Sequence, residues 1–140
     1  MPKERRGIVP ADGWYEWTLA KGSKQPWHIQ RKDRAPLNFA ALGWFGDAQD
    51  GNLGAPNAGF IIVTAGAEGG MVDVHNRRTV VFTADDAALW LDVGLPPEQA
   101  EGIARSAMGY EYFAWYSVSK AVGNVRDQGP HLAQPITKSV

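Results

Sequence analysis

Residues 8–30 read IVPADGWYEWTLAKGSKQPWHIQ, and this stretch decides the fold class because it predicts short strands joined by tight turns. The Asp12-Gly13 pair and the Lys21-Gly22-Ser23-Lys24 segment are typical of turns. The segments around them are rich in aromatic and β-branched residues, as strands are. We therefore expect strands at 8–10, 14–19 and 26–30, of which the last two form a hairpin.

Further strands and two helices follow along the chain. Apolar, β-rich segments predict strands at 37–44, 60–65, 79–82 and 112–118. Thr83, with Asp86 three residues later, predicts the cap of a helix that ends near Gly94. The segment Pro96-Pro97-Glu98 predicts the start of a second helix, which we expect to end at Gly109.

These elements predict an α+β fold. We expect a strongly curved, mostly antiparallel sheet or partial barrel with about two peripheral helices. Residues 47–58 are rich in Gly, Asn, Asp and Pro and predict an exposed loop between strands. A length of 140 residues fits one domain, so we expect a single domain over 1–140.

Composition excludes several classes of protein. With 44% hydrophobic and 21% charged residues, the chain is neither disordered nor fibrous. No apolar run is long enough for a membrane helix, so we expect no membrane association. The first residues, MPKERRG, lack the apolar segment of a secretory signal, which predicts a cytoplasmic protein.

The sequence has no cysteine, which excludes disulfides, thiolate metal sites and a cysteine nucleophile. The histidines are His28, His75 and His131, and no two have the spacing of a zinc motif. We expect neither a metal ion nor an organic cofactor. His28, on a hairpin strand, is expected at the surface, and His131, in the tail, has no obvious partner.

Charge is unevenly distributed although the net charge is only −1. Residues 1–34 carry +4, residues 47–111 carry −7, and residues 120–140 carry +2. Trp14 and three further tryptophans lie in or near the basic first segment, and interleaved aromatic and basic residues are typical of single-stranded nucleic acid binding. Tryptophans are more often core residues, however, and charge alone favours an ordinary solvated surface.

Glu16 is the first candidate catalytic residue. It lies between Tyr15 and Trp17, and aromatic surroundings raise the pKa of a carboxyl group toward the range useful for proton transfer. Strand alternation puts Trp14 and Glu16 on one face and Tyr15 and Trp17 on the other. An outward-facing Glu16 above a core of aromatic residues explains the pattern equally well.

His75 is the second candidate, in the segment Asp73-Val74-His75-Asn76-Arg77-Arg78. A histidine beside two arginines can act as an acid or base on an anionic substrate, while Arg77 and Arg78 bind phosphate. By composition alone, the segment is more simply an exposed polar loop.

Six segments in order along the chain resemble the SRAP (SOS response-associated peptidase) family. Residues 9–17, VPADGWYEW, resemble its PADGxxEW motif, and the others resemble its KQP, FxIVTA, IHxR, VS…VGNV and QPI segments. The five further segments are residues 24–26, 60–65, 72–78, 118–125 and 134–136. Because they span nearly the whole chain, the resemblance is specific.

The resemblance implies a protein of DNA repair in the SOS response that binds single-stranded DNA at abasic sites. In the family, an N-terminal cysteine forms a thiazolidine with the opened sugar and is linked to peptidase and lyase-like activity. Glu16 and His75 match the family's proton-transferring glutamate and histidine. Thr64 and Arg77 match positions that hold the DNA backbone, and Arg78 and Trp14 are predicted to contact DNA beside them.

The chain departs from the family pattern at its start. We expect the family's MCGR segment and the asparagine of its NAR motif to be missing, so the covalent step is expected to be lost. Missing first strands would leave exposed sheet edges through which the chain would dimerise or aggregate. A truncated sequence, a natural remnant, and a second chain supplying the missing part remain open, and we favour a truncated or degenerate member.

Alternative functions follow from the same departure. The chain can be a non-catalytic module that binds single-stranded DNA, or an inert fragment. The secondary amine of Pro2, exposed after removal of Met1, could also form an iminium with an aldehyde. Pro2 does not take the place of the family cysteine, so this alternative is the weakest.

Overall fold

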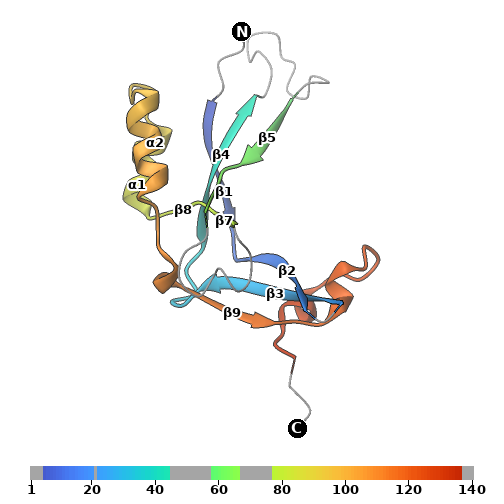
Figure 1. Ribbon diagram of the computed structural model, residues 1–140. Coiled ribbons are helices and arrows are strands. Elements are labelled where there is room, and N and C mark those ends of the chain that lie inside the picture. Colours follow the sequence, from blue (N-terminus) through green and yellow to red (C-terminus); the bar gives the residue numbers. More distant parts are fainter. Residues whose placement is uncertain (1–4, 21, 45–57, 67–76, 137–140) are drawn as a thin grey trace. The chain divides into compact units, whose positions relative to one another are not determined.

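The computed structural model describes residues 5–20, 22–44, 58–66 and 77–136 (Figure 1). The chain divides into two compact units. The first contains Met1–Ala11, Leu37–Ala65 and Arg78–Met108, and the second contains Asp12–Pro36, Gly66–Arg77 and Gly109–Val140. The α+β class is confirmed, with mostly antiparallel strands and two α-helices in the described part of the chain.

The first unit contains an antiparallel sheet centred on β4 (Leu37–Trp44). Strands β1 (Arg5–Ala11) and β5 (Gly59–Ile62) flank β4, and β8 (Val81–Phe82) also pairs with it. In this register, Ala41 of β4 pairs with Gly7 of β1 on one side and with Ile62 of β5 on the other. Strand β4 has the predicted bounds and is mostly buried, in agreement with its apolar sequence.

Two helices, α1 (Ala84–Leu91) and α2 (Pro97–Arg105), follow β8. The predicted cap is confirmed, because the Asp86 backbone N–H donates to Thr83 Oγ1 at 3.2 Å. Helix α2 ends at Arg105, earlier than the predicted end at Gly109. Met108, outside the helix, donates its backbone N–H to the Val81 carbonyl at 3.1 Å, so tertiary pairing ends the helix before the glycine.

The core of the first unit forms between the sheet and these helices. The rings of Phe82 and Trp90 lie 5.3 Å apart, and both residues are buried. The other buried members of this cluster are Ala40, Val80, Ala87 and Ala100. Apolar area removed from water in this way is the main stabilising contribution to such a unit.

The predicted strand 60–65 is divided in two, β5 and β6 (Thr64–Gly66). Between them, Val63 donates its N–H to the Ala40 carbonyl at 2.9 Å and accepts from the Val80 N–H at 2.9 Å. The predicted strand 79–82 is likewise divided into β7 (Arg77–Thr79) and β8. Strand β6 pairs with β7. Val63 and Val80 thus bond with each other and with Ala40 outside the regular strand pairs, and each predicted strand is divided at that residue.

The second unit contains a three-stranded antiparallel sheet in the order β2 (Trp14–Ala20), β3 (Ser23–Arg31) and β9 (Phe113–Ser117). Strands β2 and β3 form the predicted hairpin, with Ala20 opposite Ser23. Gly22 in its turn has φ +76°, a conformation that glycine adopts without steric cost.

The tail of the second unit folds as short 3₁₀ helices, namely η3 (Tyr110–Tyr112), η4 (Lys120–Gly123) and η5 (Pro130–Ala133). Residues after η5 return to the sheet, where the Ile136 N–H donates to the Ser117 carbonyl at 3.0 Å and Pro135 bridges to Val118. The tail is therefore attached to the end of β9.

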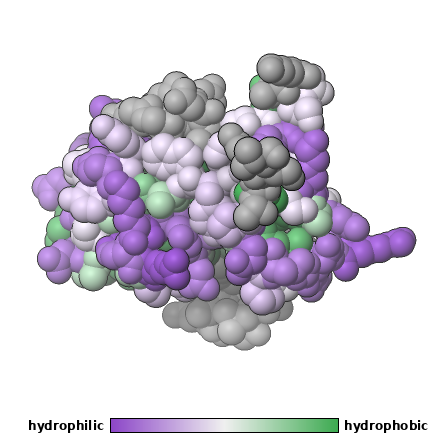
Figure 2. Space-filling view, turned by 90° about the horizontal axis from the view of Figure 1, so that it is seen from below, coloured by the Kyte–Doolittle hydropathy of each residue, from purple (hydrophilic) through white to green (hydrophobic). Residues whose placement is uncertain are grey.

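Figure 2 shows hydrophobic residues scattered among hydrophilic ones on the face it displays, as on an ordinary protein surface. Among the described residues, neither α-helix has the length and apolar character that crossing a membrane requires. Most of the predicted loop 47–58 and the segment around His75 lie outside the described residues.

Candidate functional site

The β2–β3–β9 sheet presents two different faces. Pairing across the three strands aligns Glu16 with Trp27 and Ser117, and aligns Tyr15 with His28 and Tyr116. Because successive side chains alternate between faces, these two rows lie on opposite sides of the sheet. The predicted separation of Glu16 from Tyr15 is confirmed by this register.

The face with Glu16 is rich in tryptophan. Trp14, Trp27 and Trp115 share the parity of Glu16 in the paired strands. Trp14 packs edge-on against Phe113 with ring centroids 5.6 Å apart, and Trp27 Nε1 donates to Thr18 Oγ1 at 2.9 Å. These contacts fix two of the rings beside the position of Glu16.

Glu16 itself is half-buried on this face. Its carboxylate forms no hydrogen bond or ion pair with another described residue. A carboxylate in such surroundings can accept a hydrogen bond from a ligand or exchange a proton with it. The other predicted catalytic residue, His75, lies outside the described residues.

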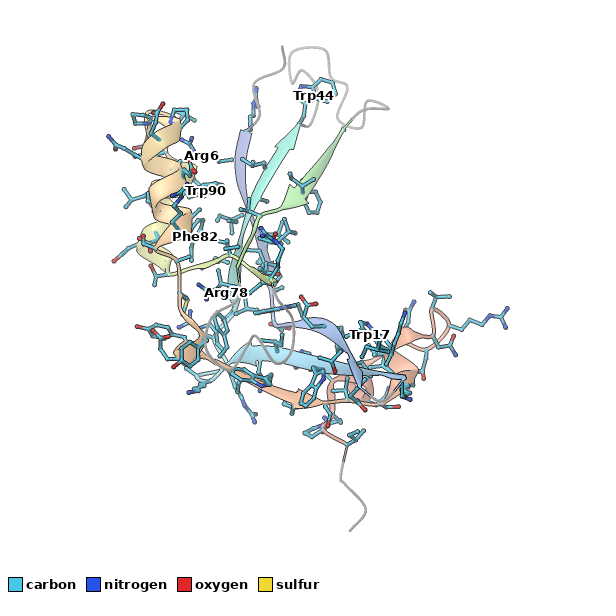
Figure 3. All side chains as sticks on the ribbon, in the orientation of Figure 1. Arg6, Trp17, Trp44, Arg78, Phe82 and Trp90 are labelled. Atoms are coloured by element: carbon cyan, nitrogen blue, oxygen red, sulfur yellow. The ribbon has the colours of Figure 1, made fainter. Side chains whose placement is uncertain are left out.

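The predicted DNA-contacting residues differ in exposure. Thr64 on β6 and Arg77 on β7 are exposed, whereas Arg78 is buried and its Nη1 donates to the Met108 carbonyl. This buried bond of Arg78, which is labelled in Figure 3, holds the segment after α2 in place within the first unit. The DNA contacts of all three residues stay predictions.

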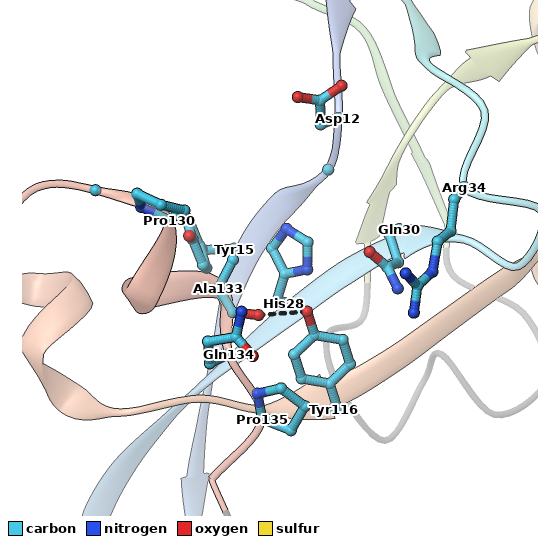
Figure 4. A pocket seen from close by; sticks show the side chains of 12 residues that line it. Asp12, Tyr15, His28, Gln30, Arg34, Tyr116, Pro130, Ala133, Gln134 and Pro135 are labelled. Atoms are coloured by element: carbon cyan, nitrogen blue, oxygen red, sulfur yellow. Dashed lines mark hydrogen bonds between the residues drawn. The ribbon is translucent and has the colours of Figure 1, made fainter.

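A cavity of about 620 Å³ opens on the face opposite Glu16 (Figure 4). His28 lies in it between two tyrosine rings, with centroids 5.2 Å from Tyr15 and 5.4 Å from Tyr116. The expected surface position of His28 is therefore wrong, because strand pairing encloses it until only 8% of the residue is exposed. The expectation for His131 is also wrong, since its Nε2 pairs with Asp127 Oδ1 at 2.8 Å.

Gly13 in the predicted turn is required by the close approach of β3. A Cβ at this position would lie 2.5 Å from His28 Nε2 and 2.6 Å from the Ile29 carbonyl oxygen. Since the carbonyl belongs to the backbone, it cannot move away without disturbing the strand. The glycine of the Asp-Gly turn therefore allows β2 to start directly beside His28.

Burial lowers the pKa of His28 below its ordinary value of 6.5. Above pH 6.5 the ring is neutral in both folded and unfolded chains. As the pH falls through 6.5, the unfolded chain takes up a proton that folded His28 resists, so stability is lost. Burial also raises the pKa of the Tyr116 hydroxyl. The nearby Tyr15 raises this pKa further, whereas the positive charge of Arg34 lowers it.

Urea unfolding at pH 7.5, 6.5 and 5.5 checks this linkage. We expect the free energy of unfolding to fall with pH, and the fall to be smaller in a His28→Gln variant. His131→Gln, which changes an exposed histidine of the same unit, serves as the control and should retain the slope contributed by His28. An equal slope in all three proteins would contradict the role of His28.

A model of the family described as SOS response associated peptidase (SRAP) matches residues 1–125 of the chain. The chain belongs to the SRAP family. This confirms the resemblance seen in the sequence motifs.

Relatives in the SRAP family are named for abasic sites. The abasic site processing protein YedK of Escherichia coli K12 is 40% identical over 132 residues, which cover 94% of this chain and 58% of YedK. The abasic site processing protein HMCES of Gallus gallus is 30% identical over 156 residues, covering 99% of this chain and 46% of HMCES. The chain thus spans about half the length of these relatives.

Solved structures agree with the SRAP assignment. A phage-related protein of Bordetella bronchiseptica has a TM-score of 0.67 at 40% identity, over 83% of this chain and 54% of that one. A protein of Bacteroides thetaiotaomicron has a TM-score of 0.74 at 21% identity, over 97% of this chain and 59% of that one. The second likeness supports the fold alone.

Several SRAP-like motifs have structural roles in this chain. The amide of Gln25, in the KQP-like segment, donates to the carbonyls of Pro26 at 3.0 Å and Val118 at 2.9 Å. Pro135, in the QPI-like segment, bridges to Val118. These segments therefore connect β3, the end of β9 and the tail within the second unit.

No motif or spacing in the sequence groups Tyr15, His28 and Tyr116 as one site. The turn predicted at residues 21–24 would place Tyr15 opposite Gln30, but β3 begins at Ser23, so the register pairs Tyr15 with His28. No local signal indicates that Tyr116 joins them, because more than half the chain lies between β3 and β9. Among the described residues, no cluster of three His, Cys, Asp or Glu residues suits a metal ion.

Proposed function

We propose that this chain binds single-stranded DNA at abasic sites through the sheet face that carries Glu16. The observation that carries the proposal is the half-buried carboxylate of Glu16, unpaired among the described residues, on a face shared with Trp14, Trp27 and Trp115. Family membership supports the substrate, since two SRAP relatives are named abasic site processing proteins.

The chemistry of an abasic site suits such a face. The damaged sugar lacks a base and exposes a C1′ hydroxyl, which can donate a hydrogen bond to the Glu16 carboxylate. Opening of the sugar moves a proton between this hydroxyl and the ring oxygen, a transfer that a positioned carboxylate assists. Bases beside the lesion in a single strand are free to stack on tryptophan rings.

The proposed complex is non-covalent. The 140 residues contain no cysteine, so no thiazolidine forms on this polypeptide alone. Thr64 and Arg77 are proposed to hold the DNA backbone, as exposed polar residues that contact phosphate do. His75 is proposed as a second proton-transferring group, and the role in the SOS response and the cytoplasmic location belong to the same proposal.

Self-association is a second part of the proposal. Strand β5 carries Phe60 and Ile61 with exposed fractions of 55% and 64%, and only one side of β5 pairs with β4 among the described residues. Exposed apolar edge strands favour pairing between chains. We propose that the two units belong to one SRAP domain and that this edge supports a homodimer.

Fluorescence anisotropy with a labelled single strand tests the DNA proposal. One oligonucleotide carries a natural abasic site, a second carries a tetrahydrofuran analogue without the C1′ hydroxyl, and a third is undamaged. We expect the natural abasic site to bind most tightly. Glu16→Gln should weaken it by about fivefold, because a neutral acceptor replaces a charged one, and should change binding of the tetrahydrofuran strand much less.

Glu111→Gln provides the matched control, because Glu111 is an exposed carboxylate of the same unit. Equal affinity for damaged and undamaged strands would contradict the proposal. A band that survives denaturation would overturn its non-covalent part and direct attention to the amine of Pro2 or to a lysine. Raised salt should weaken all three complexes if phosphate contacts contribute.

A further inference from the structure

The His28 cavity has the features of a preformed ligand site. It lies entirely within the second unit, on the face of the β2–β3–β9 sheet opposite Glu16. Its wall on the tail side is fixed, because the Tyr116 hydroxyl donates to the Ala133 carbonyl and Pro135 bridges to Val118 (Figure 4). A cavity of about 620 Å³ is in the ordinary range for small-molecule sites.

The His28 ring has a nitrogen whose hydrogen-bonding capacity is not used within the described part of the chain. The residue is 8% exposed, and its Nδ1 atom is buried without a hydrogen-bond partner among the described residues. Leaving a buried polar atom unsatisfied is costly, and such atoms are rare in folded proteins. Because His28 also lines the cavity, we expect a ligand there to bring hydrogen-bonding groups to this ring.

The lining defines the chemistry of the ligand. Tyr15, His28 and Tyr116 present a row of aromatic rings, which favours a flat aromatic group. Gln30 and Gln134 offer amide groups that can both donate and accept hydrogen bonds. This combination of stacking surface and two-way hydrogen bonding is suited to the face and edge of a nucleobase.

Charged groups lie at the same cavity. Arg34 is exposed and lines it, and a guanidinium there can bind phosphate in a bidentate manner. Asp12 also lines the cavity, and its carboxylate would repel a phosphate placed beside it but can accept hydrogen bonds from sugar hydroxyls or base amino groups. The phosphate is therefore assigned to Arg34.

We propose that the His28 cavity binds a nucleotide, with its base on the Tyr15–His28–Tyr116 row and its phosphate at Arg34. The ligand can be a free mononucleotide or one nucleotide of a DNA strand, since both present the same base and phosphate. The site is separate from the proposed abasic-site face, because the two occupy opposite faces of one sheet.

Histidine NMR provides a direct test, because the whole chain has only three histidines. The full chain, with ¹³C-labelled histidine, is titrated separately with each of the four deoxynucleoside 5′-monophosphates. Deoxynucleosides, inorganic phosphate and an undamaged single strand are titrated in the same way. We expect a saturable shift of the His28 Cε1–H signal, which is the signal missing from His28→Gln.

Arg34→Asn tests the phosphate contact. Arg34 has φ +60°, a conformation that asparagine accepts, so the substitution should fold. It should weaken monophosphate binding by about tenfold, as expected for one lost charge-assisted contact, and leave deoxynucleoside binding nearly unchanged. Arg126→Asn, at an exposed arginine of the same unit outside the cavity lining, is the control.

The possible results separate the sources of the ligand. A shift with monophosphates supports a free nucleotide, and a shift with the oligonucleotide alone supports a nucleotide of a strand. No shift with either would overturn the proposal, as would an equal effect of inorganic phosphate. Because none of these probes contains an abasic site, failure here leaves the proposed abasic-site function to its own test.

Discussion

Replacing Phe82 with alanine should lower the free energy of unfolding by about 3–5 kcal/mol. Phe82 has an exposed fraction of 0% and packs against Trp90, with ring centroids 5.3 Å apart. The substitution removes buried apolar surface and leaves a cavity between β8 and α1, which the surrounding backbone can fill only in part. Urea unfolding followed by far-ultraviolet circular dichroism measures the loss.

Leu89→Ala is the matched control for this prediction. It also truncates an apolar side chain of the same unit, but Leu89 is 47% exposed on α1. Its cost should be about 1 kcal/mol or less, because alanine favours helix and little buried surface is lost. If the two substitutions cost the same, the placement of Phe82 at the centre of this core would be wrong.

Local signals explain which elements could be predicted from the sequence. Strand β4 has its predicted bounds because its apolar run is bounded by polar and glycine-rich segments. The β2–β3 hairpin follows from Gly22, and α1 starts at the predicted cap because the Thr83 hydroxyl accepts from Asp86. Each of these features depends on residues within about ten positions of one another.

Long-range pairing explains where the predictions failed. The division at Val63 depends on hydrogen bonds to Ala40 and Val80, which are distant in the sequence. Helix α2 ends early because Met108 pairs with Val81 instead of extending the helix. Propensity patterns hold no information on such contacts, since tertiary structure overrides local preference there.

The same distinction applies to the candidate site. Alternation within one strand correctly separated Glu16 from Tyr15, because the side-chain period of a strand is a local property. The burial of His28 was missed because it depends on Tyr116 in β9 and on the tail beyond it. Motif comparison identified the family, whereas the His28 cavity emerged only from the packing of distant segments.

Arg6 of β1 is expected to make the second large contribution to stability, because it bonds with the end of α1 and the loop that follows. Its Nε donates to the Trp90 carbonyl at 2.7 Å, and its Nη2 donates to the carbonyls of Asp92 at 2.7 Å and Leu95 at 2.9 Å. The guanidinium carbon also lies 5.7 Å from the centre of the Trp90 ring (Figure 3). One side chain of β1 thus bonds with the Trp90 carbonyl at the end of α1 and with two carbonyls of the loop that follows.

Arg6→Ala should therefore lower the free energy of unfolding by about 2–3 kcal/mol, because charge-assisted hydrogen bonds are lost and partly buried carbonyls remain unsatisfied. Arg6→Lys should recover only part of this loss, since an ammonium group cannot reproduce the planar fork of a guanidinium. The same urea unfolding measurement applies.

Arg5→Ala is the control, because Arg5 is the exposed neighbour of Arg6 on the same strand. This substitution removes the same charge. It should change stability by about 0.5 kcal/mol or less. An equal loss in both alanine variants would mean that Arg6 acts through general charge alone. A larger loss for Arg6, with partial recovery by lysine, would mean that its fork specifically attaches the end of α1 to β1, within the core that contains Phe82.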